Sequence, residues 1–247
     1  MTTINSPHVC RKSYHTDIVN PTSVDLEANY TLQKESKTDF ITKIYTTLCF
    51  QLSITFAMSL AFYRSMSITN YVVTHPEMLY ASIALTFVFL ILSMPCLFGK
   101  THPLNLVCLF GFTICESYSV AYVSLFYTAP SVIMAWGMTL STFIFLTIYV
   151  FQTKEDFNFL GAGLYSCLWV LILGGFIQLV FLPNSQFLNT AMAILGSMVA
   201  IGYILYDTSE IIHRMEKDEY IFACMNLYLD IIMLFLRLLE LFGDRRE

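Results

Sequence analysis

Seven long apolar runs divide this chain and limit the folds that are open to it. Each run has about 20 residues or more, enough as an α-helix to cross the roughly 30 Å hydrocarbon core of a bilayer. The loops between them are short. The sequence therefore predicts an all-α membrane protein, a seven-transmembrane-helix bundle over residues 40–247. The runs are 41–63, 79–98, 104–126, 131–151, 159–182, 187–212 and 220–242.

Residues 1–39 lie outside these runs and are polar, with Pro7 and Pro21 among them, so we expect a flexible N-terminal tail. No basic segment followed by an apolar core precedes the first run, and we therefore expect the first helix to direct insertion without a cleaved signal peptide. The net charge is −5 and no basic stripe is present, which excludes nucleic acid as a partner.

The distribution of Lys and Arg predicts a cytosolic N-terminus. Arg64 is the only basic residue in the loops of the opposite side. Arg245 and Arg246 are the exception, because they fall on that opposite side if 220–242 crosses the membrane. A re-entrant last segment would avoid this, but the run lacks a Gly or Pro break, which favours a full crossing. The basic residues of the cytosolic side are Arg11, Lys12, Lys34, Lys37, Lys43, Lys100, Lys154, Arg214 and Lys217.

Three carboxylates lie inside apolar runs, namely Glu116, Asp207 and Asp230. Each costs about 2.5–3.5 kcal/mol at the centre of a bilayer, so each needs a partner or a function. At 100° per residue, Asn226, Asp230 and Arg237 fall within about 40° of one another on a helix, and this polar stripe must face the bundle. A second stripe consists of Thr113, Glu116 and Ser119.

Asp207 and Asp230 are expected to meet across a helical hairpin. If the chain turns within 213–219, they lie roughly 9 Å and 15 Å from the turn, an offset of about one helical turn. Two carboxylates in a low dielectric should share a proton, which predicts a proton-controlled latch. Two alternatives stay open: hydrogen bonds to neighbouring Ser, Thr or Tyr side chains, or a structural bridge between Asp230 and Arg237.

The stretches "FQTKEDFNFLGAGLYSCLWVLILGGF" (151–176) and "GYILYDTSEIIHRMEKDEYIFACMNLYLDIIMLFLRLLEL" (202–241) resemble the transmembrane Bax inhibitor motif family, also called Lifeguard. The most similar branch is that of the Golgi anti-apoptotic proteins. The stretch "HPLNLVCLFGFTICESYSVAYVSLFY" (102–127) belongs to the same resemblance, which covers the membrane region from about residue 40. Asp156 and Phe157 match a "DF" signature of the family, which we interpret as a helix N-cap with a hydrophobic anchor.

The resemblance implies roles for the acidic residues. Asp207 and Asp230 would form the pH sensor and gate, and Asp218 and Asp230 would belong to the ion pathway. Glu116 matches the acidic residue of the third-helix pattern and is a further pathway candidate, although a structural role also fits.

One departure from the family concerns the latch. Bacterial relatives are thought to latch the sensor with an arginine of the second helix, but 79–98 contains neither Arg nor Lys. Arg237 is the candidate latch partner that the apolar runs offer instead.

The resemblance implies a pH-sensitive, calcium-permeable leak channel of the Golgi and endoplasmic reticulum that lowers stored calcium and inhibits apoptosis. Calcium is then the permeant ion and the proton a regulator. We expect no enzyme activity, no cofactor and no stable metal site, only transient calcium near Asp207 and Asp230. Membrane lipid is the expected partner, while calcium-release channels, apoptosis regulators and a homo-oligomer stay open.

Two other function classes compete with the channel. A non-conducting membrane scaffold that regulates calcium signalling is the first. An intramembrane aspartyl protease is the second, because two aspartates in consecutive helices could act as general acid and base. Against the protease, residues 227–230 read "LYLD" where such enzymes have Gly-x-Gly-Asp.

Overall fold

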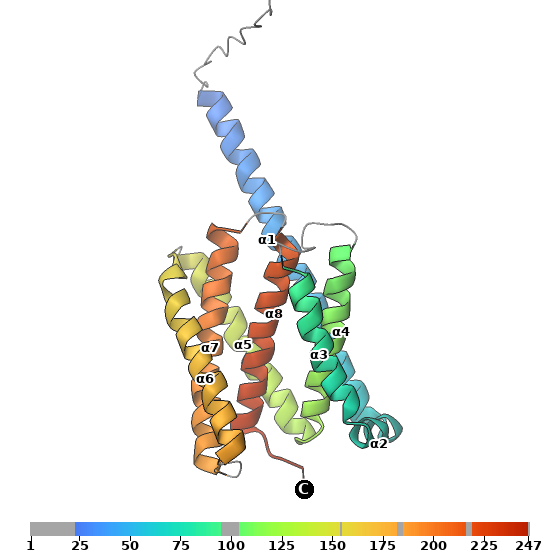
Figure 1. Ribbon diagram of the computed structural model, residues 1–247. Helices are drawn as coiled ribbons and strands as arrows, with labels where there is room; N and C mark the ends of the chain where they lie inside the picture. Colours follow the sequence, from blue (N-terminus) through green and yellow to red (C-terminus); the bar gives the residue numbers. More distant parts are fainter. Residues whose placement is uncertain (1–22, 95–103, 154, 182–184, 216–218, 247) are drawn as a thin grey trace, which may run out of the picture. The chain divides into compact units, whose positions relative to one another are not determined.

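A computed structural model describes residues 23–94, 104–153, 155–181, 185–215 and 219–246, with side chains from residue 37 onward except that of residue 179 (Figure 1). The chain divides into two compact units, Met1–Thr38 and Asp39–Glu247, and the second is the helical bundle. Its helices confirm the predicted all-α, multi-pass architecture: six are long and apolar enough to cross a membrane, or seven when α2 and α3 count as one span.

The elements follow one another along the chain as helices joined by short connections. They are α1 (Ser23–Arg64), α2 (Met66–Thr74), α3 (Glu77–Leu92), α4 (Leu104–Ser124), α5 (Ala129–Thr153), the 3₁₀-helix η1 (Phe157–Leu160), α6 (Gly161–Phe181), α7 (Gln186–His213) and α8 (Tyr220–Phe242).

Helix α1 begins at Ser23, inside the segment that was expected to be a flexible tail. Residues 24–37 contain Leu, Glu, Ala, Gln and Lys and no proline, so their intrinsic preference is helical although they are too polar for a hydrophobic core. The part of α1 that is apolar enough to cross a membrane is Lys37–Arg64.

The second span differs from the predicted single run 79–98. In its place stand α2 and α3, bent by 81° at the break between them, which is the geometry of a broken span or of a re-entrant loop. The hydroxyl of Ser65 accepts a hydrogen bond from the backbone N–H of Ile68 at the start of α2. Pro76, which has no N–H to donate, stands at the start of α3 and prevents α2 from continuing. Helix α2 was missed because its residues mix polar and apolar side chains, and residues 95–98 of the predicted run lie outside the described residues.

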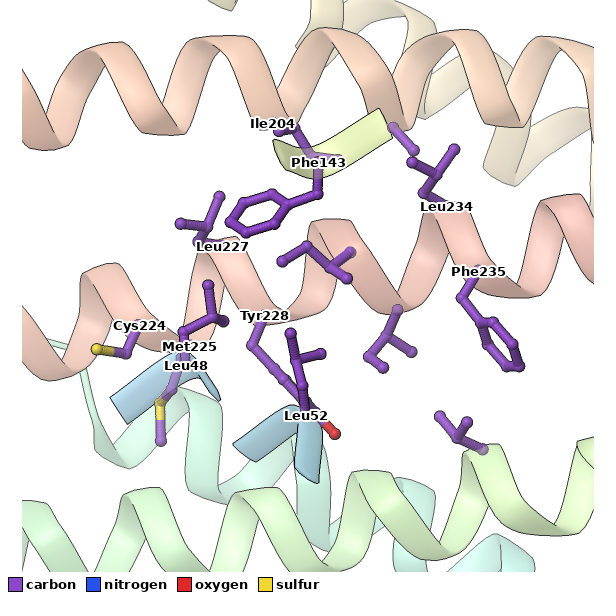
Figure 2. Close-up of a cluster of buried hydrophobic side chains, with 14 of the residues drawn as sticks. Leu48, Leu52, Phe143, Ile204, Cys224, Met225, Leu227, Tyr228, Leu234 and Phe235 are labelled. Atoms are coloured by element: carbon purple, nitrogen blue, oxygen red, sulfur yellow. The ribbon is translucent and has the colours of Figure 1, made fainter. Parts of the chain in front are cut away.

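Helix α8 forms the centre of the bundle. It lies between α7 on one side and α3 on the other (Figure 1). In its most apolar stretch 61% of the residues are buried, whereas the corresponding share in the candidate span that contains α6 is 11%. Figure 2 shows Leu227 and Leu234 on the side of α8 toward α7, and Tyr228 and Phe235 on the opposite side. The ring of Phe235 stacks on Trp136 of α5, with the centroids 4.4 Å apart. The core is therefore built around α8, whereas α6 is left to face lipid.

Buried hydroxyl and amide groups join α1, α4 and α8. Oγ1 of Thr55 lies 2.9 Å from Oγ of Ser117 and 2.8 Å from the hydroxyl of Tyr228. One turn earlier on α1, Nε2 of Gln51 donates to Oγ1 of Thr113 over 2.9 Å. Because the hydrocarbon core offers no water, these contacts supply hydrogen bonds that the side chains would otherwise lack.

Residues 243–246 pair with the turn between α4 and α5, and we call this pairing the C-terminal clasp. The N–H of Thr128 donates to the carbonyl of Asp244, and the N–H of Arg246 to the carbonyl of Phe126, each over 2.9 Å. Oγ of Ser131 accepts from the N–H of Asp244 over 3.0 Å. The chain after α8 therefore ends at the same end of the bundle as the α4–α5 turn.

The opposite end of the bundle is marked by an ion pair. Arg214, which follows α7, lies 3.1 Å from Asp156, which precedes η1. Helix α5 runs from the α4–α5 turn to this end, and α8 runs from this end to the clasp. Helix α8 thus crosses the bundle as one unbroken helix, and the re-entrant alternative for the last segment is wrong. Which end faces the cytosol stays a prediction.

The clasp also accounts for arginines that the charge pattern placed on the unexpected side. The guanidinium of Arg246 lies 4.5 Å from the ring centroid of Tyr63 on α1. The hydroxyl of that tyrosine reaches the carbonyl of Tyr127 at 2.7 Å and that of Ser124 at 2.5 Å. Arg246 is therefore held by main-chain and aromatic contacts at the end of the bundle that carries the α4–α5 turn.

Replacing Tyr63 tests the clasp. Tyr63→Phe removes the hydroxyl that reaches the carbonyl of Tyr127, while the carbonyl of Ser124 keeps the N–H of Tyr127 as a donor, so the change should destabilise the protein by about 1–2 kcal/mol and lower Tm by a few degrees. Thermal unfolding in detergent measures the change. Tyr80→Phe, at an exposed position of α3, is the matched control and should leave Tm unchanged. Equal Tm values for both variants and the wild type would contradict the proposed role of this hydroxyl.

Candidate ion and proton site

The carboxyl groups of Asp207 on α7 and Asp230 on α8 lie within hydrogen-bonding reach of each other, and we call them the aspartyl pair. Their side chains are buried, at 7% and 9% exposed. Because a carboxylate only accepts hydrogen bonds, a bond between two carboxyl groups requires that one of them carry a proton. The arrangement therefore suits a single shared proton in the interior of the bundle, and whether the pair holds one stays a prediction.

The hairpin geometry explains why these residues meet. Helix α7 ends at His213 and α8 begins at Tyr220, so Asp207 stands six residues before the end of one helix and Asp230 ten residues after the start of the next. At 1.5 Å per residue the offset is about 6 Å, or one helical turn, which two side chains can bridge. The predicted proximity is confirmed, and the role of the pair as a pH sensor stays a prediction.

The surroundings of the aspartyl pair are short of positive charge. Among the described residues, neither carboxyl group makes an ion pair with Lys or Arg, and Oδ2 of Asp230 has no hydrogen-bond partner. Glu210, one turn further along α7, adds negative potential at Asp207. These surroundings therefore favour the binding of a proton or of a mobile cation by the two carboxyl groups.

Arg237, the candidate latch partner, is engaged elsewhere. Its Nη1 lies 2.9 Å from Oε2 of Glu240 on the same helix. Its stem packs against Gly196 of α7, where an added Cβ would lie 2.6 Å from Nε of the arginine. The alternative of a structural bridge between Asp230 and Arg237 is therefore wrong in this structure, and no contact places the arginine at the aspartyl pair.

Glu116 is not brought to the aspartyl pair. It lies on α4, is hydrogen-bonded to Thr86 of α3, and faces a cavity that α8 lines with Leu229 and Leu236. The neighbouring aspartate of α8 points instead to α7. Asp218, the other predicted pathway residue, lies outside the described residues.

Asp156 confirms the interpretation of the "DF" signature as an N-cap. Its Oδ1 accepts from the N–H of Asn158 over 3.0 Å, and its Oδ2 accepts from Arg214 over 3.1 Å. These two contacts, the backbone one first, lower the pKa of the Asp156 carboxyl group. The N–H of Phe157 donates to Oγ of Ser209, two residues beyond Asp207, over 3.1 Å. The loop before α6 is thus tied to the helix that carries the aspartyl pair.

No group of three or more His, Cys, Asp or Glu side chains suited to a metal ion exists within the part of the chain that the structure describes. The aspartyl pair offers oxygen ligands from two residues only. Calcium usually takes six to eight oxygen ligands, so the pair by itself is too small for a tight calcium site.

Comparison with known proteins places the chain in a family. The profile described as "Inhibitor of apoptosis-promoting Bax1" matches residues 37–247. The chain belongs to the Bax inhibitor/Lifeguard family. The match covers the whole bundle, including the aspartyl pair, Glu116 and the clasp residues.

Named relatives come from animals, viruses and yeast. Protein lifeguard 4 of Mus musculus is 40% identical over 206 residues, which cover 81% of this chain and 83% of the relative. The Golgi anti-apoptotic protein of Vaccinia virus (strain Lister) is 39% identical over 202 residues, covering 82% and 84%. Bax inhibitor 1 of Schizosaccharomyces pombe is 36% identical over 212 residues, covering 85% and 78%.

Variants of Asp156 test the N-cap and its ion pair. The folded-state pKa lies below the unfolded value, so the carboxylate stabilises the fold above about pH 4 and this contribution is lost as the pH falls through the folded pKa. At pH 7 Asp156→Ala should lower Tm more than Asp156→Asn, because Asn can still cap the helix. The difference in Tm between wild type and Asp156→Asn should close on acidification, and a constant difference at all pH values would contradict this account.

Proposed function

We propose that this chain is a pH-sensitive, calcium-permeable leak channel of Golgi and endoplasmic reticulum membranes that lowers stored calcium and inhibits apoptosis. Membership of the Bax inhibitor/Lifeguard family supports the anti-apoptotic part, together with relatives named Bax inhibitor 1 and Golgi anti-apoptotic protein. The second of these names supports the Golgi as location. The role that we propose is non-enzymatic.

The observation that carries the proposal is the buried aspartyl pair without a cationic partner among the described residues. Loss of the shared proton removes the hydrogen bond between α7 and α8 and leaves two like charges in a low dielectric. The contact between these helices would then change with pH. Because α8 is the central helix, a change in its contact with α7 reaches most of the bundle.

Calcium fits the same two carboxyl groups chemically. It prefers carboxylate oxygens, and a weak, incomplete ligand set allows an ion to leave as well as to enter. Glu210 on α7 lies close enough to act on Asp207, and Tyr203 lies near both carboxyl groups, so these are the titratable neighbours that would modulate the response. Proton and calcium would compete for one site.

Calcium flux from liposomes that contain only the purified protein tests this proposal. Asp207→Asn and Asp230→Asn should each abolish most of the pH dependence, because an amide cannot share the proton in the same way. Asp156→Asn, which also removes a carboxylate but lies outside the pair, is the matched control and should keep the wild-type pH profile. Wild-type profiles in both pair variants would refute the sensor role, and no flux at any pH would favour a non-conducting scaffold.

A second experiment separates a mouth residue from the aspartyl pair. Asp218 lies 12 residues before Asp230 in the sequence, a separation that would be roughly 18 Å in helical geometry, and we propose that it raises the local cation concentration from a cytosolic mouth. Salt screens such an effect over about 8–10 Å. Single-channel recordings of Asp218→Asn should show lower conductance mainly at low salt with the pH response intact. Asp230→Asn should alter both at any salt, and identical behaviour of the two variants would remove this distinction.

A further inference from the structure

A cavity of about 320 Å³ lies between α3, α4 and α8, on a different side of α8 from the aspartyl pair. Its walls are mainly Leu, Ile, Val and Phe side chains. The exceptions are Glu116, Ser119 and Thr86. A cavity of this size is at the lower end of the range of ligand pockets, which start at about 300 Å³.

Glu116 is the only charged residue that lines this cavity, and in the described part of the chain it makes no ion pair. The neighbouring hydroxyl groups donate to backbone carbonyls: Thr86 to that of Ser82 over 3.0 Å, and Ser119 to that of Cys115 over 3.2 Å. Among the described residues, Thr86 is the one side chain within hydrogen-bonding reach of the glutamate. An ionised carboxylate in such surroundings is costly without a cation.

The cavity is bordered by residues on the outer surface of α3. Ile83 and Phe87 line it and are 39% and 60% exposed, so on a membrane-spanning helix they contact lipid. A ligand can therefore enter sideways from the hydrocarbon. Glu116 stands eight residues before the end of α4 at Ser124, about 12 Å along the axis, so the charged group of a ligand must reach well below the interface.

We propose that this cavity binds a single-chain amphiphile with a primary amine, whose ammonium group pairs with the carboxylate of Glu116 while its chain lies along α3 and α8. Charge complementarity selects the amine, because the carboxylate faces otherwise apolar walls. The small volume selects one chain and a compact head. Phosphate-bearing lipids are disfavoured because their anionic group would lie beside a carboxylate.

This site is independent of the proposed calcium conduction. Leu229 and Leu236 face the cavity, whereas Asp230 faces α7, so the two sites use different faces of α8. The proposal gives Glu116 a role as a lipid-binding residue rather than as part of the ion pathway. A failure of one proposal therefore leaves the other standing.

Photolabelling in liposomes tests the proposal with a clickable, photoreactive sphingosine as the amine probe. The matched probe is a photoreactive fatty alcohol with the same chain length and no amine. Sphingosine should label peptides of α3, α4 or α8 saturably, and Glu116→Gln should reduce this labelling about tenfold by removing the charged partner. Labelling by the alcohol should be weak and equal in both proteins.

Two further variants keep the result interpretable. Asp156→Asn, which removes a carboxylate that does not line the cavity, should retain full sphingosine labelling. Leu229→Trp, which keeps Glu116 but fills the cavity, should abolish labelling, and Tm of every variant is measured in parallel. Equal labelling of the wild type by amine and alcohol would overturn the proposal, and so would amine labelling that survives in Glu116→Gln. Crosslinks between copies of this chain at Glu116 would overturn it as well, because a second protein molecule would then occupy the cavity.

Discussion

The two buried carboxyl groups of Asp207 and Asp230, within hydrogen-bonding reach of each other, are the polar constraint inside the otherwise apolar contact between the last two helices. They place a polar, proton-dependent contact between α7 and the central helix of the bundle. In the hydrocarbon core no water replaces a lost hydrogen bond, so the two carboxyl groups must find each other, a proton or a cation. Since α8 is the most buried span, any change in this contact is transmitted to the helices packed around it.

Because polar groups in the hydrocarbon core need partners within the protein, those of α8 lie on distinct faces of the helix, each toward a different neighbour. Tyr228 reaches the hydroxyl of Thr55 on α1, Asp230 reaches α7, and leucines of α8 line the cavity of Glu116. The C-terminal clasp then fixes the end of α8 against the α4–α5 turn, and the ion pair of Asp156 and Arg214 ties the other end. These separate contacts would allow one bundle to combine the proposed proton site with the proposed lipid site.

Much of the fold and the meeting of the aspartates followed from the sequence, because helix rise and hydrophobic length are nearly constant quantities. The 81° bend between α2 and α3 did not, since residues 66–74 show no long apolar run and only Pro76 marked the break. Thr113, Glu116 and Ser119 form the predicted inward stripe, but their partners on α1 and α3 depend on packing between helices far apart in sequence. Arg237 pairs locally with Glu240, which spacing alone did not distinguish from a bond to Asp230.

The most direct measurement of the central claim is infrared difference spectroscopy of the protein in liposomes during a pH titration. The account predicts a protonated carboxyl band in the wild type that reports the shared proton of Asp207 and Asp230, and that remains in Glu116→Gln, which removes the carboxyl group of the separate cavity. This band should be lost or strongly shifted in each of the two single Asn variants, and it should persist in Asp156→Asn. A band that is unchanged in either pair variant would contradict the shared proton, and with it the account of how α7 and α8 respond to pH.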